Sequence, residues 1–574
     1  MEEKVSLKRH CNKVALIGVL LVVSAILLNI KYIFTDFGID AGFQVSMSYR
    51  LATGDAMFRE MWEPYQMSAF LCAFFIKIYL ELFHTTTGIV LYLQVIGVLI
   101  DAGLSILLYR MVKKHLNAPK TGFFMAWLFF VVSPKDIPLA DYTNMQMWFC
   151  LLLCLFLFLH YKTDKIRFMI PAALCLCGAV LSYPSCLVLY LGVAGILIYQ
   201  RKYKSVLAFT ATCALVGGIY LGAIFIQIPM NEFMDIVHNM LAIETSHSMS
   251  MGQRFLWYLK DLIKIGLVFL VLYGVSYGIV RISTRKNESD KEIKGVMTDF
   301  IFLISGVGVG LYTVICWKTH VRYSYSVVFL AIIIIGLKYV KKLTKDKLFF
   351  YLLGTVVSML QFVATLILTN LVFIASVPYL LIAVLAACLP LAEALSVLKD
   401  KKSLIILKRA FVTICLMFLM FRNAYIIRPL QWDVSTILNI GMIVKEGPAI
   451  GVVSEYMGPY IQNESINEWK AYIKEGQSVY IIGYSLDTMG YLYVDTEIAA
   501  PSLVPTPDYN EAVLEYWEDN PEKYPDVIVA SCWYGELDAT LTEDSWMMQW
   551  IEDKYQPAYY IDGKFWRYYF REAE

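Results

Sequence analysis

Residues 36–66, a short stretch between the first apolar segment and the next, concentrate acidic side chains near the start of the chain. Only two basic residues accompany the five carboxylates there, which are Asp36, Asp40, Asp55, Glu60 and Glu63 against Arg50 and Arg59. A well-placed carboxylate can take the proton of a hydroxyl group as that group reacts, which is general-base chemistry. A simple tether has no use for such a group. We therefore expect an enzyme that activates a hydroxyl beside a membrane.

The rest of the chain is the reason to expect a membrane. It is 58% apolar with a mean hydropathy of +0.58. Apolar runs of roughly 15–25 residues recur between Val14 and Tyr425, and about 20 such residues span the hydrocarbon as a helix. The fold class predicted is a polytopic α-helical membrane protein. The first run has a basic flank and no small-residue cleavage site, which indicates a retained span.

The formal net charge of +1 hides two oppositely charged parts. From residue 430 to the end there are 8 Lys and Arg against 25 Asp and Glu, whereas the remainder has 41 against 23. The composition predicts a basic transmembrane domain at 1–429 and an acidic domain at 430–574.

Basic clusters set the predicted topology, because cytoplasmic loops carry an excess of Lys and Arg. After the basic N-terminus, they recur at 110–120, 162–167, 201–204, 281–294, 338–347 and 399–409. The apolar runs between them predict thirteen spans, near 14–34, 87–110, 121–133, 145–161, 168–183, 185–199, 205–227, 258–281, 299–317, 323–338, 348–368, 371–396 and 405–425. An odd number places the N-terminus in the cytoplasm and the acidic domain outside, in a multi-pass plasma-membrane protein.

One apolar run, Gln66–Phe83, does not fit this scheme as a span. It is short and carries Lys77 and Glu81, and counting it as a crossing would turn the next basic cluster outward. We expect an interfacial helix with Lys77 reaching the headgroups, within a first outer loop at 35–83. A short true span is the alternative.

The acidic domain has the pattern of an α/β fold. Ser478–Gly483 and Pro525–Ser531 are short apolar runs typical of buried strands, and helical stretches at 509–518 and 544–555 alternate with them. This order predicts a small parallel sheet. The domain holds 7 of the 12 Trp residues. A core and a membrane-facing surface explain them more simply than sugar stacking does.

The first outer loop resembles that of the GT-C glycosyltransferases, which include protein O-mannosyltransferases and aminoarabinose transferases. The resemblance rests on DAGF at 40–43, Gly54-Asp55, and WEPYQ at 62–66 leading into an apolar helix. Two further loops strengthen it, one with Asp141 before the fourth span and one with Lys318-Thr-His320-Val-Arg322-Tyr323 before the tenth.

This resemblance implies transfer of a sugar from a polyprenyl phosphate to an acceptor hydroxyl at the outer membrane face, usually with inversion. Asp40 would be the general base, and Asp36 and Asp141 would orient the base or the acceptor. The leaving phosphate needs cations or donors. A larger group would bind the substrates: Glu63, Gln66, Lys77, Arg254, His320, Arg322 and Tyr323.

Several rival interpretations stay open. Asp40 stands where the cap of a helix at 41–51 would stand, and Ala41 replaces the Glu that the family usually has there. Arg322 could instead anchor a span end at the headgroups. The departure at Ala41 favours another sugar or another acceptor over the modification of lipid A.

No cofactor is expected, and a divalent metal is left open. The resemblance to the aminoarabinose transferases implies a metal ion held by His238, Glu244 and His247 with Glu63, although the spacing of these residues forms no metal signature. The expected partners are a polyprenyl-phosphate-linked sugar, membrane lipid, and a glycan, lipid or protein acceptor, with no nucleic acid. The alternatives are a transporter or lipid flippase, a lipid-linked glycan polymerase or ligase, and a structural or sensory membrane protein.

Overall fold

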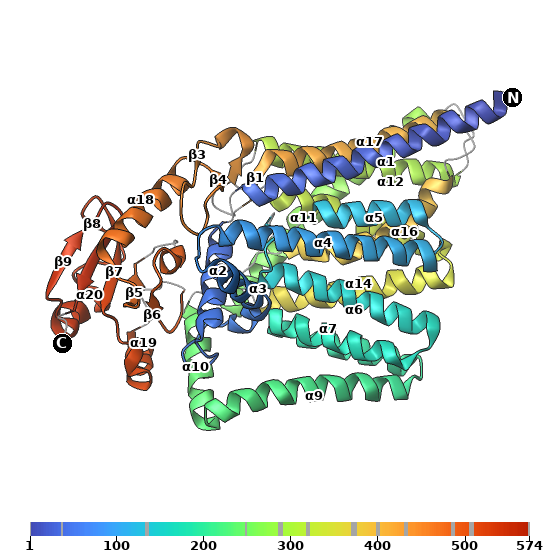
Figure 1. Cartoon of the computed structure of the whole chain (residues 1–574). Helices are drawn as coiled ribbons and strands as arrows, with labels where there is room; N and C mark the ends of the chain where they lie inside the picture. Colours follow the sequence, from blue (N-terminus) through green and yellow to red (C-terminus); the bar gives the residue numbers. More distant parts are fainter. Residues whose placement is uncertain are drawn as a thin grey trace.

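The apolar runs form long helices that lie side by side in one bundle, with the C-terminal domain at one end of it (Figure 1). Helices are expected because hydrocarbon offers no water to pair backbone N–H and C=O groups, which a helix pairs internally. This computed structural model describes residues 2–35, 38–132, 137–246, 250–284, 291–316, 322–368, 376–397, 402–429, 434–483, 488–503 and 510–571.

Each predicted span falls on a helix wherever the structure describes it. The helices are α1 (Glu2–Phe34), α4 (Ile89–His115), α5 (Pro119–Val131), α6 (Tyr142–Thr163), α7 (Met169–Ser182), α8 (Val188–Tyr199), α9 (Tyr203–Gln227), α11 (Met251–Ser283), α12 (Lys291–Cys316), α13 (Arg322–Tyr339), α14 (Lys345–Leu368), α16 (Leu381–Ser396) and α17 (Lys402–Tyr425). Within the described residues, nine helical segments are long and apolar enough to cross a membrane. The prediction of a helical multi-pass chain is confirmed, and the number of thirteen stays a prediction.

The first loop forms two helices at the end of the bundle nearest the C-terminal domain, α2 (Gly38–Thr53) and α3 (Ala69–Phe83) (Figure 1). A 3-10 turn at Gln66–Ser68 leads into α3, and the combined segment is one of the nine apolar ones. Both of its flanks contact the C-terminal domain. The Trp62 amide donates to the Pro501 carbonyl at 2.8 Å, and the Thr86 hydroxyl donates to the Leu492 carbonyl at 2.8 Å.

Another connecting helix, α10 (Met230–Ser246), joins the first loop to the C-terminal domain. Its Phe233 ring packs on Phe58 with centroids 5.0 Å apart. On the same helix, Asn239 donates to the Glu515 carboxylate at 3.0 Å. The loop between α9 and α11 therefore folds back over the end of the bundle.

The C-terminal domain contains a sheet in the order β6-β5-β7-β10-β9, with β8 beside β7. Its strands are β5 (Ser478–Ile482), β6 (Glu497–Ile498), β7 (Val527–Trp533), β8 (Glu536–Leu537), β9 (Tyr559–Asp562) and β10 (Trp566–Phe570). Short pairs precede it, β1 (Ile426–Pro429) with β2 (Val434–Thr436) and β3 (Met442–Ile443) with β4 (Val453–Ser454). The helices of the domain are α18 (Met457–Tyr472), α19 (Asn510–Asp519) and α20 (Trp546–Trp550), the last continuing as a π-turn to Tyr555.

The predicted parallel sheet is right for one half of this sheet and wrong for the other. β5 runs parallel to β6 and β7, and α19 lies on the crossover between β5 and β7. β10 pairs antiparallel with both β7 and β9. The reason is the short connection around Gly563, because a tight hairpin can join only antiparallel strands, whereas a parallel pair needs a crossover.

Candidate functional site

Asp40, the predicted general base, lies in the first turn of α2 and is half-buried. The helix begins at Gly38, so Asp40 lies inside the helix and not at the cap position expected for it. A carboxylate in a first turn is stabilised by the positive end of the helix dipole. Gln44 and Ser48 follow Asp40 at four-residue intervals, which places the three polar side chains along one face of α2.

That face of α2 is tied to the start of α3. Gln44 donates to the Ser68 carbonyl at 3.2 Å, and the Ser68 hydroxyl donates back to the Gln44 amide oxygen at 3.1 Å. One turn further, the Ser48 hydroxyl lies in hydrogen-bond contact with the Cys72 thiol, which is also in the field of Asp141. Asp141, the second predicted acid, therefore lies near the Ser48 end of this polar face, about two helical turns from Asp40.

Asp141 is buried and caps α6. Its carboxylate accepts a hydrogen bond from the Asn144 amide N–H at 2.7 Å, and the Asn144 side chain donates to the carbonyls of Ile137 and Leu139 at 2.6 and 2.7 Å. These bonds fix the loop that carries the acid. The loop also lies against α4, where a Cβ on Gly97 would come within 1.4 Å of the Pro138 carbonyl oxygen. Since Gly97 is about 12 Å along α4 from its start, Asp141 is recessed within the bundle.

Three tyrosines from three separate loops stack beside Asp141. Tyr65 lies 5.3 Å from Tyr142 with the rings 15° apart, and 5.8 Å from Tyr183 with the rings 24° apart. Tyr142 directly follows Asp141, and Tyr65 and Tyr142 are both partly exposed. Stacked rings next to a carboxylate combine a flat apolar surface with a hydrogen-bond acceptor. Such a surface suits a sugar ring, which has an apolar face and hydroxyl groups around it.

Arg50, which the sequence analysis did not single out, is the most connected charge in the first loop. Its fully buried guanidinium donates to Asp55, to the Glu60 carbonyl and, at 2.8 Å, to the Tyr516 hydroxyl of the C-terminal domain. Lys523, also from that domain, approaches Asp55 at 2.8 Å. The signal available in the sequence was that only two basic residues, Arg50 and Arg59, stand among the five acids.

Glu63, predicted as a substrate contact, is fully buried in this same junction. One of its carboxylate oxygens lies 3.5 Å from the Arg50 guanidinium and accepts a hydrogen bond from the Leu503 amide at 3.1 Å. Burial raises the pKa of Glu63 to about 7, although Arg50 opposes this shift. The contacts that the structure shows for Glu63 are with the protein itself, and its contact with a substrate stays a prediction.

The other described candidates are dispersed. Gln66 is buried, and its amide oxygen accepts a hydrogen bond from the Phe58 amide at 2.8 Å. Lys77 is exposed on α3, and its contact with headgroups or substrate stays a prediction. Arg254 is half-buried in the first turns of α11. The structure thus places Asp141 near the Ser48 end of the polar face that begins at Asp40, and it holds Glu63 in the domain junction.

Most of the remaining predicted residues have no described side chain. Asp36 and His320 lie outside the described residues, and so does His247. Arg322 and Tyr323 begin α13, but only their backbone is described. Glu244 lies in α10, also without a described side chain, and His238 is exposed there. Among the described residues, no group of three or more His, Cys, Asp or Glu side chains is arranged to hold a metal ion.

No protein-family model matches the chain, and a search of curated proteins finds no match either.

Proposed function

We propose that the chain is a GT-C-like glycosyltransferase that moves a sugar from a polyprenyl phosphate to an acceptor hydroxyl. One observation carries this proposal: Tyr65, Tyr142 and Tyr183, from three separate loops, stack next to the buried acid Asp141, at the end of the bundle where α2 carries Asp40. Acid groups next to aromatic rings suit the binding and activation of a sugar hydroxyl. The site lies at the end of an apolar helix bundle, where a lipid-borne donor would present its headgroup.

In the proposed reaction, the acceptor oxygen attacks the anomeric carbon of the donor and a new C–O bond forms there. Asp40 takes the proton of the acceptor hydroxyl, and the bond from the anomeric carbon to the phosphate oxygen breaks. The polyprenyl phosphate leaves with the electron pair of that bond, and the configuration at the carbon inverts because the acceptor attacks from the opposite face. Arg254, His320 and Arg322 are proposed as partners of the leaving phosphate, Arg being suited to two-point contact.

We further propose thirteen crossings in the plasma membrane, with the N-terminus in the cytoplasm and the C-terminal domain outside. The opposite positions of α1's N-terminal end and the C-terminal domain along the bundle support an odd number (Figure 1). The contacts of Trp62 and Thr86 with the same domain support an interfacial α3, because the chain is on one side of the bundle both before and after it.

A transporter is the second candidate, and one observation favours it. Asp101 is buried in the middle of α4, and the Trp148 indole of α6 donates to it at 2.6 Å. Acidic residues inside a membrane bundle often belong to ion or substrate pathways.

The test of the proposed function compares membranes of cells that lack the gene with membranes of cells that carry it. Polyprenyl-phosphate-linked sugars are extracted with organic solvent and identified by mass spectrometry. The glycosyltransferase proposal predicts that one such sugar accumulates without the gene and that one surface glycan loses that sugar. An unchanged lipid-linked pool would contradict the proposal and favour the transporter.

A further inference from the structure

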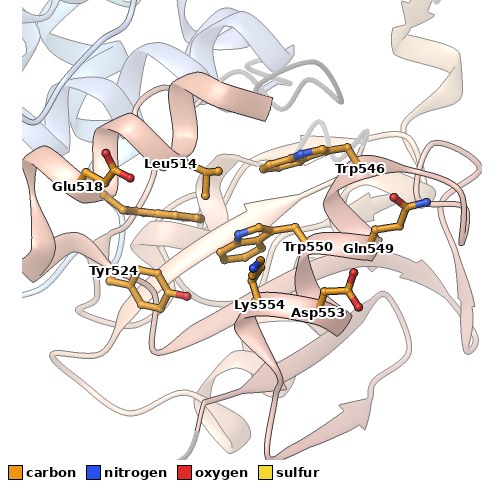
Figure 2. A pocket seen from close by; sticks show the side chains of 9 residues that line it. Leu514, Glu518, Tyr524, Trp546, Gln549, Trp550, Asp553 and Lys554 are labelled. Atoms are coloured by element: carbon orange, nitrogen blue, oxygen red, sulfur yellow. The ribbon is translucent and has the colours of Figure 1, made fainter.

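The C-terminal domain has a pocket that the proposed transfer site does not use. It has a volume of about 520 Å³ and lies between α19 and α20 (Figure 2). Leu514, Trp517 and Glu518 of α19 form one side of it, and Trp546, Gln549 and Trp550 of α20 form the other. A pocket of this size falls in the range that accommodates a small-molecule ligand.

Three indole rings line the pocket as a series. Trp517 and Trp550 lie 5.0 Å apart with their rings 30° from parallel, and Trp546 and Trp550 lie 6.2 Å apart with their rings 14° from parallel. The orientation of Trp517 is fixed because its indole N–H donates to the Ala499 carbonyl at 2.9 Å. Tyr524 supports the series by packing against both Trp517 and Trp550.

These rings are not merely part of the domain core. Trp517 and Trp550 are buried in the protein, but Trp546 is partly exposed and the space in front of the rings is open. A ring that only filled a core would be enclosed by other side chains at close-packed density. The α19–α20 pocket instead leaves a flat aromatic surface accessible to a ligand.

Polar side chains surround the aromatic surface. Glu518, Gln549, Asp553 and Lys554 are exposed and belong to the lining of the pocket, and Figure 2 shows them around Trp550. Carboxylates accept hydrogen bonds, the ammonium donates them, and the amide does both. This combination matches a sugar, which offers hydroxyl donors and acceptors around an apolar ring face.

The charge of the domain further restricts the class of ligand that the pocket can bind. Asp553 and Glu518 are the acids at the pocket, and Lys554 is the base. The domain as a whole has 25 acidic against 8 basic residues from residue 430 onward. Such a field disfavours a phosphorylated or carboxylated ligand and favours a neutral or amino-bearing one.

We propose that the α19–α20 pocket binds a neutral or amino-bearing saccharide, with Trp546 as the stacking platform, Trp550 packed behind it, and Gln549 and Asp553 as hydroxyl partners. The saccharide would be the glycan that accepts the transferred sugar or the product that carries it. This assignment of the glycan's role rests on the proposed glycosyltransferase function. The binding itself does not require transfer, so it can be measured separately.

The experiment measures saccharide binding to the full-length protein in lipid nanodiscs by isothermal titration calorimetry. The probes are maltohexaose, cellohexaose and chitohexaose, which differ in linkage and in the acetamido group. We expect at least one to bind, and Trp546→Ala to weaken its binding by about tenfold, a change of about 1.4 kcal/mol. Gln549→Ala, which alters an exposed side chain, should weaken binding several-fold without a packing change.

Trp533→Ala is the matched control, because Trp533 is a 48% exposed indole of β7 that packs on Phe565, away from the pocket. It should bind each probe within twofold of the wild-type protein. No binding of any probe at millimolar concentration, or equal weakening in Trp546→Ala and Trp533→Ala, would overturn the proposal. Binding of decane in place of the saccharides, abolished by Trp546→Ala, would overturn it as well and assign the pocket to a lipid chain.

The two proposals fail in different ways. If the saccharide binds but the polyprenyl-phosphate pool is unchanged in cells that lack the gene, the pocket assignment holds and the transferase assignment falls. If the pool changes but no saccharide binds, the transferase assignment holds and the pocket assignment falls.

Discussion

At the scale of single residues, Arg50 connects the first loop to the C-terminal domain. Its guanidinium is fully enclosed, and its partners come from both sides of the junction: Asp55, Glu63 and the Glu60 carbonyl from the loop, and Tyr516 from the domain. Burying charges is costly unless they are paired and hydrogen-bonded. The pairing in this junction therefore depends on the two parts being docked.

Replacing Arg50 should destabilise the protein strongly. Arg50→Met removes the cation and leaves Asp55 and Glu63 without it in a buried site, so we expect a loss of about 3–5 kcal/mol in the free energy of unfolding. Arg59→Met is the control, since Arg59 is exposed and its pair with Glu60 should be worth less than about 1 kcal/mol. Thermal unfolding in nanodiscs, followed by light scattering and tryptophan fluorescence, measures both. Equal stability of the two variants would contradict the role given to Arg50.

Glu63 should make the docking of the C-terminal domain depend on pH. Burial raises its pKa from an ordinary value of 4.5 to about 7, so the folded state holds a proton that the unfolded state releases. The contribution is fully present below about pH 4.5 and is lost as the pH rises through about 7, a change of up to about 3 kcal/mol. Limited proteolysis of the domain junction should therefore be faster at pH 8 than at pH 5.5.

The control for this pH dependence is Glu63→Gln, which keeps an acceptor for the Leu503 amide and cannot titrate. Its proteolysis rate should change much less between pH 5.5 and pH 8. A Glu63→Gln protein with the wild-type pH profile would show that another group titrates. Arg50 and Asp55 are the charged groups that act on Glu63 in the junction, and Lys523 in turn pairs with Asp55.

The sequence showed which residue types gather in residues 36–66 but not which side chains they contact in the fold. The acids of residues 36–66 could be recognised as an outer-loop cluster because the flanking runs are apolar. The pairing of Glu63 with Arg50, and of Arg50 with Tyr516, joins residues up to 466 positions apart. Spacing along the chain contains no signal for such contacts, which depend on how the C-terminal domain docks.

At the scale of elements, short helices and loops at one end of the bundle hold the candidate site. α2 presents Asp40, the α5–α6 loop presents Asp141, and the segment before α3 presents Tyr65. The close approach of Gly97 and Pro138 sets the depth of the α5–α6 loop. The position of Asp141 thus depends on a glycine in a neighbouring helix.

Gly97→Ala should displace the loop that carries Asp141. A Cβ there would come within 1.4 Å of the Pro138 carbonyl oxygen, so backbone must move, and we expect sugar transfer to fall at least tenfold. Gly103→Ala on the same helix is the control, because a Cβ there meets nothing within 4 Å. Size-exclusion chromatography measures the amount of folded protein, and sugar transfer is then compared at equal amounts. Full activity of the Gly97→Ala protein would show that the close packing of Gly97 against Pro138 does not position Asp141.

Elements with a strong pattern were predictable, and those defined by their neighbours were not. Apolar runs such as the one that forms α4 gave helices near the expected bounds, because hydrophobic length is a local property. The parallel pair β5 and β7 was also anticipated from its apolar strands. The antiparallel β9 and β10 were not, since their Tyr-rich and Trp-rich sequences lack the continuous apolar run used to find the other strands.

At the scale of the whole molecule, the bundle separates the N-terminal end of α1 from the C-terminal domain (Figure 1). The α2–α3 segment lies at the domain end, where Trp62 before α3 and Thr86 after α3 contact the domain. This arrangement gathers the first loop, α10 and the C-terminal domain on one side of the proposed membrane.

Labelling of single cysteines tests that arrangement. In a cysteine-free background, Arg59→Cys and Thr85→Cys replace exposed residues before and after α3. We expect a membrane-impermeant maleimide to label both in intact cells, because α3 does not cross. Lys165→Cys, exposed between α6 and α7 at the proposed cytoplasmic face, should react only after permeabilisation. Labelling of Arg59→Cys and Thr85→Cys from opposite sides would make α3 a span.

Sugar transfer by the Asp40→Asn protein, measured in membranes of cells that lack the wild-type gene, most directly tests whether Asp40 is the general base. Asp235→Asn, an exposed acid of α10, is the matched control. We expect Asp40→Asn to reduce transfer by about 10²–10⁴-fold, with accumulation of the polyprenyl-phosphate-linked sugar, and Asp235→Asn to behave like the wild-type protein. Full transfer by a correctly folded Asp40→Asn protein would contradict the assignment of Asp40 as the general base.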